Sequence, residues 1–458
     1  MEFDLDGLAT PFDEPFTIAS LPPEILAQVF EQALPDRHVP GKLPFEVDLS
    51  HVSGFWREVA LMTPGLWTKI DVYSPRSIPR LSLYLQRSGS QLLLDVNVNI
   101  YSYERRHGRS PTKRISLLQA MSIQLGQEIH RIRSLTLDCY FKTSPAVMLS
   151  RLVHSSAPNL RRFAVKYDVI SPVTGTLPWA YNTILNRGCP RLSFLDTELP
   201  DTLPSTLSLQ NLTTLYLHGL DESSGQTYTS FVEVLTTPRS LLYLSIQGTI
   251  KMNSWPLHQL GPQFELRNLK GLRLLDDGMM GVKVLLSMKA PKLESLWLDC
   301  SFDNFSFLFD APQMSAVVGP TKFPSLRYLT IPTDSLVLSE KFSQIFPTIT
   351  HLHLPHALFY HASQLQKTLT HRWPSLQTII FSMFKEAHSG KLYSALEAAL
   401  PLRRRAGKPI EKLLVDEDHL RVMRRTAGNI CRLIRVEALD TSNYREIWWN
   451  KVDQIHLD

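Results

Sequence analysis

The sequence is poor in cysteine, and this limits what can hold the protein together. Only four cysteines occur among 458 residues, and they are far apart with no C-x-x-C pair: Cys139, Cys189, Cys300 and Cys431. A disulfide framework or a cysteine-based zinc site needs closer or more regular spacing. We therefore expect reduced thiols, as is usual for proteins of the cytoplasm or nucleus.

Long apolar runs and a strong charge of one sign are also missing. No run of about eighteen apolar residues is present to span a bilayer. The first residues, 1–14, are acidic and lack the basic-then-apolar order of a signal peptide. The net charge is only +5, and the basic residues are scattered. These absences predict a cytoplasmic or nuclear protein, or one found in both, with no membrane contact and no nucleic-acid partner.

Catalytic motifs are absent as well. The sequence contains no G-x-S-x-G, no phosphate-binding P-loop and no H-E-x-x-H. His351, His353 and His356 have a spacing that zinc can use, but no nearby cysteine or carboxylate completes a tetrahedral site. We predict no enzyme activity, no cofactor and no metal. An enzyme with an unrecognised site would instead require a deep polar pocket with perturbed titratable groups.

What the sequence does contain begins with two predicted amphipathic helices between residues 21 and 67. Pro22 and Pro23 suit only the opening of the first helix, where the backbone amides have no intrahelical partner. Its apolar face consists of Ile25, Leu26, Val29, Phe30 and Ala33. The apolar face of the second consists of Leu49, Val52, Phe55, Trp56, Val59 and Ala60. Helices this short cannot bury such faces on each other alone, so they must also pack on the rest of the chain or on a second protein.

These residues resemble an F-box. The opening residues 21–26, Leu-Pro-Pro-Glu-Ile-Leu, followed by Val29 and Phe30, look like the leucine-proline start of that family. Residues 48–53, leading to Trp56, Arg57 and Glu58, are similar to its second half. Residues 63–67, Thr-Pro-Gly-Leu-Trp, resemble the ending common in fungal members.

The resemblance implies a module that binds a Skp-type adaptor and, through it, a cullin-type ubiquitin ligase. The residues it assigns to adaptor binding are Leu21, Pro22, Ile25, Leu26, Val29, Leu49, Val52 and Trp56. The structural alternative is a helical cap on the domain that follows, because the end units of repeat stacks are commonly helical and atypical.

Between the helices and the repeats, local patterns predict a strand at residues 66–73, a helix at 77–87 and a strand at 92–100. Residues 101–114 carry five basic side chains and predict an exposed loop. The run Arg403-Arg404-Arg405 is interpreted in the same way, as a solvated charged surface.

From residue 132 onward a six-residue phrase recurs, in which the first, fourth and sixth positions are apolar. The clearest copy is Leu293-Glu294-Ser295-Leu296-Trp297-Leu298. The first positions fall at residues 132, 160, 192, 212, 241, 269, 293, 326, 349, 376 and 410. The gaps range from 20 to 34 with a mean near 28, which matches the period of leucine-rich repeats. Each unit would bury its leucines only by stacking on its neighbours.

Side chains that alternate with these leucines are expected on the opposite, exposed sheet face, where repeat proteins usually bind partners. We predict that a protein substrate binds there, through Tyr216, Tyr243, Arg273, Trp297 and Tyr328. The open alternative is that the aromatic residues only shield neighbouring strands.

The sequence thus predicts an α/β protein with an N-terminal helical F-box and a leucine-rich-repeat solenoid whose parallel sheet is curved. The predicted parts are a flexible segment at 1–16, the F-box at 17–66, linking elements at 67–131, and the repeats at 132–458 with a C-terminal cap around Trp448 and Trp449. The predicted function is the substrate-recognition subunit of a cullin-type ubiquitin ligase. The alternative is an interaction scaffold not linked to ubiquitination.

Overall fold

The computed structural model describes most of the repeat strands and the helices that accompany them. The described residues are 18, 21–35, 42–74, 77–107, 111–141, 143–169, 185, 187–198, 209–218, 228–248, 264–276, 280–300, 322–331, 343–344, 346–355, 362–382 and 389–439. The predicted flexible segment 1–16, His356, and the part of the predicted cap with Trp448 and Trp449 lie outside them. The chain divides into two compact units, Met1–Pro178 with Ile184–Arg191 and Trp179–Thr183 with Leu192–Asp458.

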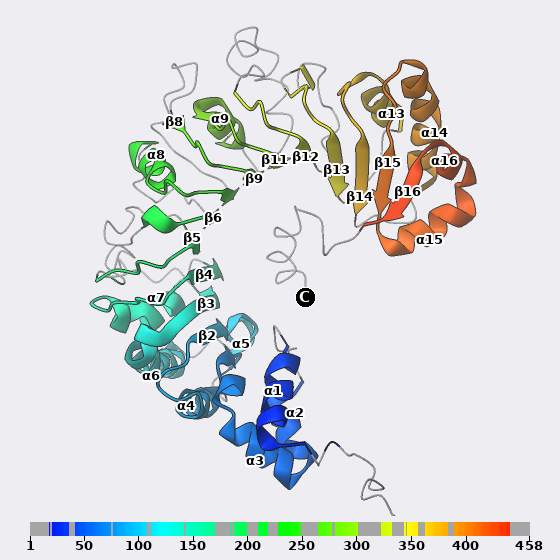
Figure 1. Ribbon diagram of the computed structural model, residues 1–458. Coiled ribbons are helices and arrows are strands. Elements are labelled where there is room, and N and C mark those ends of the chain that lie inside the picture. The colour runs from blue at the N-terminus through cyan, green and yellow to red at the C-terminus, as the bar shows by residue number, and fades with distance from the viewer. Residues whose placement is uncertain are drawn as a thin grey trace, which may run out of the picture. The chain divides into compact units, whose positions relative to one another are not determined.

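The first unit begins with helices and continues with parallel strands (Figure 1). Its elements are α1 (Pro23–Ala33), α2 (Phe45–Val52), α3 (Gly54–Met62), the 3-10 turn η2 (Pro64–Trp67), β1 (Lys69–Val72), α4 (Ile78–Arg87), β2 (Leu94–Asn99), α5 (Tyr101–His107), α6 (Pro111–Glu128), η4 (Ile129–Arg131), β3 (Ile132–Phe141), α7 (Thr143–Leu149), η5 (Ser150–Leu152) and β4 (Arg162–Val169). The strands pair in parallel in the order β1-β2-β3-β4.

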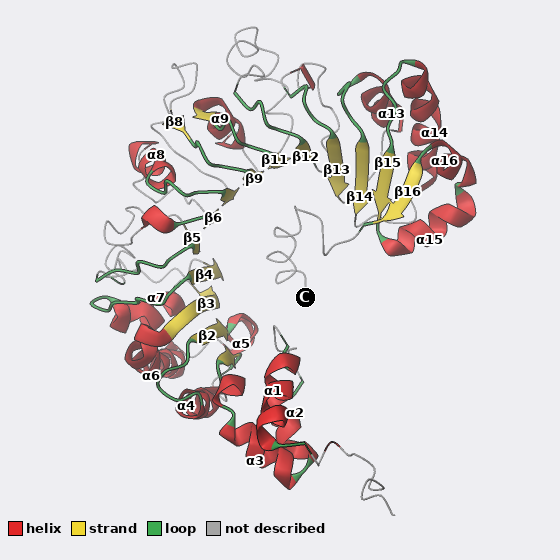
Figure 2. Cartoon of the chain, in the orientation of Figure 1, coloured by secondary structure: helices red, strands yellow, loops and turns green. Residues whose placement is uncertain are grey.

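The second unit repeats a strand and a return segment. Its elements are β5 (Phe194–Glu198), η7 (Leu209–Asn211), β6 (Thr214–His218), α8 (Tyr228–Thr236), β7 (Tyr243–Gln247), β8 (Phe264–Glu265), β9 (Gly271–Asp276), α9 (Met280–Ser287), β10 (Met288–Lys289), β11 (Ser295–Cys300), β12 (Tyr328–Thr330), β13 (His351–Pro355), α13 (Ala362–His371), β14 (Thr378–Ser382), α14 (Ser389–Arg405), β15 (Lys412–Val415), α15 (Glu417–Thr426), α16 (Gly428–Leu433) and β16 (Arg435–Ala438). Strands β5, β6, β7, β9 and β11 to β16 pair in parallel in chain order, and β8 pairs with β10 separately. Helices α8, α9, α13 and α14 lie on one side of these strands (Figure 2).

The predicted α/β class and parallel strand order are therefore confirmed. Every one of the eleven recurring phrases has its first, fourth and sixth side chains buried. In the clearest copy, Leu293, Leu296 and Leu298 are each 0% exposed. Burial of such a side chain contributes roughly 1.5 to 3 kcal/mol before the entropy of ordering is subtracted.

Side-chain hydrogen bonds connect neighbouring repeats where the phrases begin. In four repeats, the side chain of the residue that directly precedes a phrase donates a hydrogen bond to a backbone carbonyl in the preceding repeat. That carbonyl belongs to the residue two positions ahead of the first residue of the preceding phrase. The examples are Asn159 to His130 (2.9 Å), Ser240 to Gln210 (2.9 Å), Asn268 to Arg239 (2.9 Å) and Ser325 to Pro291 (2.8 Å). These bonds are the same although the gaps between phrases differ, so they hold neighbouring strands in step while the return segments vary in length. The apolar pattern of the phrases does not predict these bonds.

The predicted second helix is in fact two helices, α2 and α3. Ser53 between them is extended, with φ −157° and ψ 169°, and its hydroxyl accepts a hydrogen bond from the Trp56 amide at 3.1 Å. A serine in this position satisfies an amide in the first turn of the following helix, and it ends the preceding one. The apolar spacing continues across the break, which is why a single helix was expected.

The exposed loop predicted at residues 101–114 is wrong, because α5 and the start of α6 occupy most of it. Glu104 of α5 is only 1% exposed and accepts hydrogen bonds from the amides of Tyr140 (2.9 Å) and Phe141 (3.3 Å) and from the Ser144 hydroxyl. This buried carboxylate fixes α5 against the end of β3. Arg105 and Arg106 remain exposed, as the pattern indicated.

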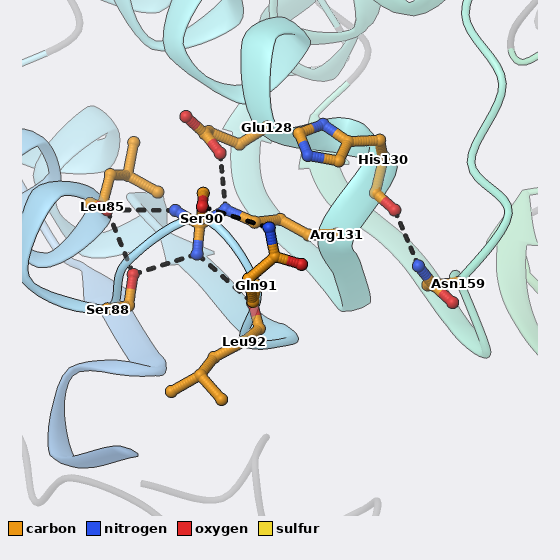
Figure 3. A network of polar contacts seen from close by, with 9 residues as sticks. All are labelled: Leu85, Ser88, Ser90, Gln91, Leu92, Glu128, His130, Arg131 and Asn159. Carbon is orange, nitrogen blue, oxygen red and sulfur yellow. Dashed lines mark hydrogen bonds and ion pairs between the residues drawn. The ribbon is translucent and has the colours of Figure 1, made fainter. Parts of the chain in front are cut away.

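A buried arginine fixes the entry to β2 in a similar way (Figure 3). Arg131 is 3% exposed and donates to the carbonyls of Leu85 (3.0 Å) and Leu92 (3.3 Å) and to the Ser88 hydroxyl (3.1 Å). Its Nε lies 2.5 Å from Glu128 Oε2. One side chain thus holds the end of α4, the start of β2 and the turn η4 together.

In the described ranges, no helix combines the length and the apolar character needed to cross a membrane. Of the cysteines in these ranges, Cys139, Cys189 and Cys431 form no disulfide bond.

Candidate functional site

The N-terminal helices form a small core of their own. Leu26 and Ala60 are 0% exposed, and the ring of Phe30 lies 4.9 Å from that of Trp56. Trp67 is 1% exposed, and its Nε1 donates to the Ala60 carbonyl at 3.0 Å. Half of the apolar set is therefore used to pack α1 and α3 on each other and on η2.

Trp67 also attaches this helical core to the first repeat elements. Its ring meets Tyr84 of α4 edge-on at 5.0 Å, and Arg87 lies 4.3 Å above it. The Tyr84 hydroxyl donates to the carboxylate of Glu46, which is 0% exposed. Burial together with the neighbouring Glu46 charge raises the pKa of Tyr84 far above its usual value. Trp67 and Tyr84 thus attach the group of helices α1, α2 and α3 to the strand and helix that follow.

The rest of the apolar set is left on the surface. Ile25 and Val29 of α1 are 44% and 46% exposed, and Val52 at the end of α2 is 60% exposed. Ile25 and Val29 are four residues apart on one helix and therefore share a face. Leu61 and Met62 at the end of α3 are also exposed, by 39% and 75%. A contiguous exposed apolar patch is the feature by which interaction surfaces are recognised, so this face is a candidate site.

The eight residues predicted to bind an adaptor therefore differ in exposure. Leu26 and Leu49 are buried in the helical core, and Trp56 packs on Phe30 while half-exposed. Leu21 is half-buried. The members open to solvent are Pro22, Ile25, Val29 and Val52. We call these last four the α1–α2 surface.

The predicted substrate-binding residues lie on neighbouring strands of the second unit, as the alternation required. Arg273 pairs with Trp297 in the β9–β11 register, and its guanidinium lies 4.5 Å from the Trp297 ring. Tyr243, Trp297 and Tyr328 are half-buried, but Tyr216 and Arg273 are only 2% and 7% exposed. The expectation that all five are exposed is therefore wrong for Tyr216 and Arg273.

The rings on this face contact one another across strands. Phe194 meets Tyr216 at 5.2 Å, Tyr328 lies 4.4 Å from His351, and Trp297 lies 6.4 Å from His353. A ring that only shields its neighbouring strands can be fully buried, whereas a ring that binds a partner must keep part of its surface exposed. The half-buried members Tyr243, Trp297 and Tyr328 are the ones that keep surface for a partner.

Two of the three histidines considered for metal binding have other contacts. His351 stacks on Tyr328, and buried His353 lies with Nε2 2.7 Å from the Ser382 hydroxyl and Nδ1 3.4 Å from that of Thr330. A further histidine, His218 at the end of β6, lies with Nε2 2.6 Å from the buried carboxylate of Asp196 in β5. Among the described residues no group of three metal-ligating side chains is gathered.

An open cavity near the end of α8 bears on the enzyme alternative. It is lined by Gln210, Thr236, Thr237 and Arg239. None of these is a carboxylate, an imidazole or a thiol, so this lining supplies no general base or activated nucleophile.

No protein-family model and no curated protein matches the sequence. Solved structures with a related arrangement include a protein from Bacteroides fragilis determined by the Northeast Structural Genomics Consortium. It is 12% identical, the match covers 80% of this chain and 82% of that one, and the TM-score is 0.33. A likeness this distant carries no argument about function.

Proposed function

We propose that this protein is a substrate-recognition subunit of a cullin-type ubiquitin ligase, with an F-box that binds a Skp-type adaptor. The proposal starts from the resemblance of residues 21–67 to the F-box family. In this role the chain performs no bond chemistry. It holds a target protein close to the ligase, with the adaptor on its helices and the target on its repeats.

The observation that carries the proposal is the division of the apolar residues in α1 and α2. Leu26, Phe30 and Leu49 are 0%, 2% and 7% exposed and account for the packing of these helices. Ile25, Val29 and Val52 are not needed for that packing and stay 44% to 60% exposed. A helical cap would gain by turning such side chains inward or by replacing them with polar ones, since each would contribute roughly 1.5 to 3 kcal/mol if buried. An adaptor-binding module needs them outside.

The first test replaces the exposed residues and leaves the core intact. We expect Ile25→Glu with Val29→Glu in the full-length protein to raise the Kd for a purified Skp-type adaptor at least about a hundredfold, roughly 2.7 kcal/mol. Two carboxylates would be desolvated in an apolar interface, and two apolar contacts would be lost. Titration calorimetry measures the change directly.

The matched control is Leu83→Glu with Leu92→Glu, because these residues are similarly exposed, by 38% and 39%, and lie outside the three helices. It should bind the adaptor like the unaltered protein. If the unaltered protein does not bind the adaptor, or if the two double variants weaken binding equally, the F-box assignment fails. The scaffold alternative would then be favoured.

For the target, we propose that the half-buried aromatic residues of β7, β11 and β12 form the central contact. These are Tyr243, Trp297 and Tyr328, and the Arg273 guanidinium packs on the face of the Trp297 ring. Arginine and large aromatic residues supply most of the binding energy in typical protein interfaces. Tyr216 is buried and would support this surface without touching the target.

We expect Trp297→Ala with Tyr243→Ala to reduce target labelling about tenfold in a proximity-labelling experiment, since each aromatic contact contributes on the order of 1 kcal/mol or more. Adaptor binding and the circular dichroism spectrum should not change. Tyr103→Ala removes a half-buried tyrosine from the first unit and serves as the control. Unchanged labelling by the double variant with an intact fold would leave the aromatic residues with a shielding role only.

A further inference from the structure

The end of the described chain carries more positive charge than the protein as a whole. Residues 401–435 contain ten basic and four acidic side chains, a net charge of +6. The entire chain has a net charge of +5, so everything outside this segment sums to −1. Eight of the ten basic residues are arginines. The charge is thus concentrated on α14, α15, α16 and β16.

Of these eight arginines, Arg403 is buried and the other seven are exposed to solvent. On α15, Leu420 and Met423 are buried at 4% and 1% exposure, while Arg421, Arg424 and Arg425 are exposed. Helix α16 packs against both α14 and α15 (Figure 1). Arg404 at the end of α14 donates to the Leu433 carbonyl at the end of α16 at 2.6 Å, which brings these two helix ends together.

Several of these cations have no acidic side chain beside them. Within the described ranges, Arg421 lies 3.7 Å from Glu417 and from Asp418, and Arg435 and Lys412 share Glu437. No carboxylate of the described chain lies within ion-pair distance of Arg405, Arg424, Arg425 or Arg432. Arginines in the last turn of a helix interact favourably with its dipole, by about 0.3 to 1 kcal/mol each. That interaction explains their place on the helices and still leaves their guanidinium groups open to a partner.

The chemistry of the surface selects among anionic partners. Residues 401–439 contain no phenylalanine, tyrosine or tryptophan, so this segment lacks the large aromatic side chains on which bases stack in single-stranded nucleic-acid binding. Leu402 is the one large apolar side chain of this described segment with high exposure, at 42%, and a membrane-binding surface would need several. Arginine forms paired hydrogen bonds with carboxylates. An acidic polypeptide fits best.

We propose that the exposed arginines of α14, α15 and α16 form a binding surface for an acidic segment of a partner protein. This surface is separate from the α1–α2 surface and does not depend on the adaptor. The affinity falls as salt is added, because exposed charges are screened.

The test measures the anisotropy of a fluorescein-labelled oligoglutamate peptide with the full-length protein at low ionic strength. We expect Arg424→Glu with Arg425→Glu to weaken binding about tenfold or more. Arg105→Glu with Arg106→Glu changes the net charge equally at another exposed pair of neighbours on α5. This control should change the affinity less than about twofold.

Equal losses in the two variants would show a general charge effect and would overturn the proposal. The proposal would also be overturned if polyuridylate or phosphatidylserine vesicles bound more tightly than the oligoglutamate peptide and only the α15 variant lost that binding. Adaptor titration on the same variant keeps the two proposals apart, since the α15 substitutions should leave adaptor binding unchanged.

Discussion

Replacing Arg403 by methionine should destabilise the protein by about 3 to 5 kcal/mol, the range seen when one member of a buried charged network is removed. Arg403 is 1% exposed and forms no ion pair with a carboxylate of the described residues, yet its guanidinium donates to five carbonyls. The acceptors, at 2.9 to 3.4 Å, are those of Leu369, Arg372, Trp373, Leu376 and Lys408. Burial lowers the pKa of Arg403, but arginine keeps its proton.

These carbonyls explain why the loss is large. Leu369 lies in the last turn of α13 and Arg372 and Trp373 just beyond it, where carbonyls lack intrahelical donors. Trp373 has a φ of +47°, a conformation that non-glycine residues rarely adopt. Leu376 opens the next recurring phrase. Without the guanidinium, the end of α13 and the entry to β14 lose their common donor, and each buried carbonyl left alone costs about 1 to 3 kcal/mol before relaxation.

Hydrogen exchange measures the local loss of stability, and urea unfolding measures the loss for the whole protein. In Arg403→Met, exchange should accelerate most in α13 and β14, and the unfolding midpoint should fall. Arg405→Met is the matched control, because Arg405 is exposed two residues away, and it should change stability by less than about 0.5 kcal/mol. Arg403→Lys keeps the charge but not the planar set of donors, so it should recover only part of the loss. Full recovery by lysine would show that charge alone matters.

The strands could be predicted because their pattern is local. Each phrase needs its first, fourth and sixth residues inside, and the structure buries all of them. The order of the strands follows from the same pattern, since units that stack in sequence place each strand beside the next. The hydrogen bonds of Asn159, Ser240, Asn268 and Ser325 do not follow from the pattern, because their acceptors lie in the preceding repeat and the apolar spacing does not specify which residues meet there.

Arg403 shows why charge runs are a poor guide to exposure. The expectation of a solvated Arg403-Arg404-Arg405 surface holds for the last two and is wrong for the first. Residues Leu396, Ala399, Leu400 and Arg403 recur at the spacing of one helix face, and all are buried. Helical phase therefore indicated that Arg403 points inward. Only the structure shows the carbonyls that make its burial tolerable.

The candidate surfaces were predictable in part. The helix spacing placed Ile25 and Val29 on one face, but it could not show that Leu26 and Phe30 alone would satisfy the packing of α1. Alternation along the strands placed Tyr216 and Arg273 opposite the leucines. Their burial depends on neighbours in adjacent strands, Phe194 for Tyr216 and Trp297 for Arg273, and these contacts follow from register, which a single sequence does not specify.

Lys322 is a buried cation like Arg403, but its hydrogen-bond donors are poorly satisfied. Replacing it is therefore expected to raise the stability of the protein, where replacing Arg403 lowers it. It is 4% exposed, and in the described part of the chain its ammonium makes one hydrogen bond, to the Leu286 carbonyl, with the Phe323 ring 5.9 Å away. An ammonium has three donors to satisfy. Burial lowers the pKa of Lys322 from 10.5 to about 7. The folded protein therefore holds this proton much less tightly than the unfolded chain does.

Lys322→Met should stabilise the protein by about 2 kcal/mol at neutral pH, because methionine fills a similar volume without a charge to desolvate. Between about pH 7 and pH 10 the unfolded chain binds more protons at this lysine than the folded protein, so the stability of the unaltered protein rises with pH. The gain from Lys322→Met is thus full at and below about pH 7 and shrinks towards pH 10. Urea unfolding across this range measures it, with exposed Lys367→Met as the control. A loss of stability, or a gain that does not depend on pH, would show that the Lys322 ammonium is satisfied in the fold.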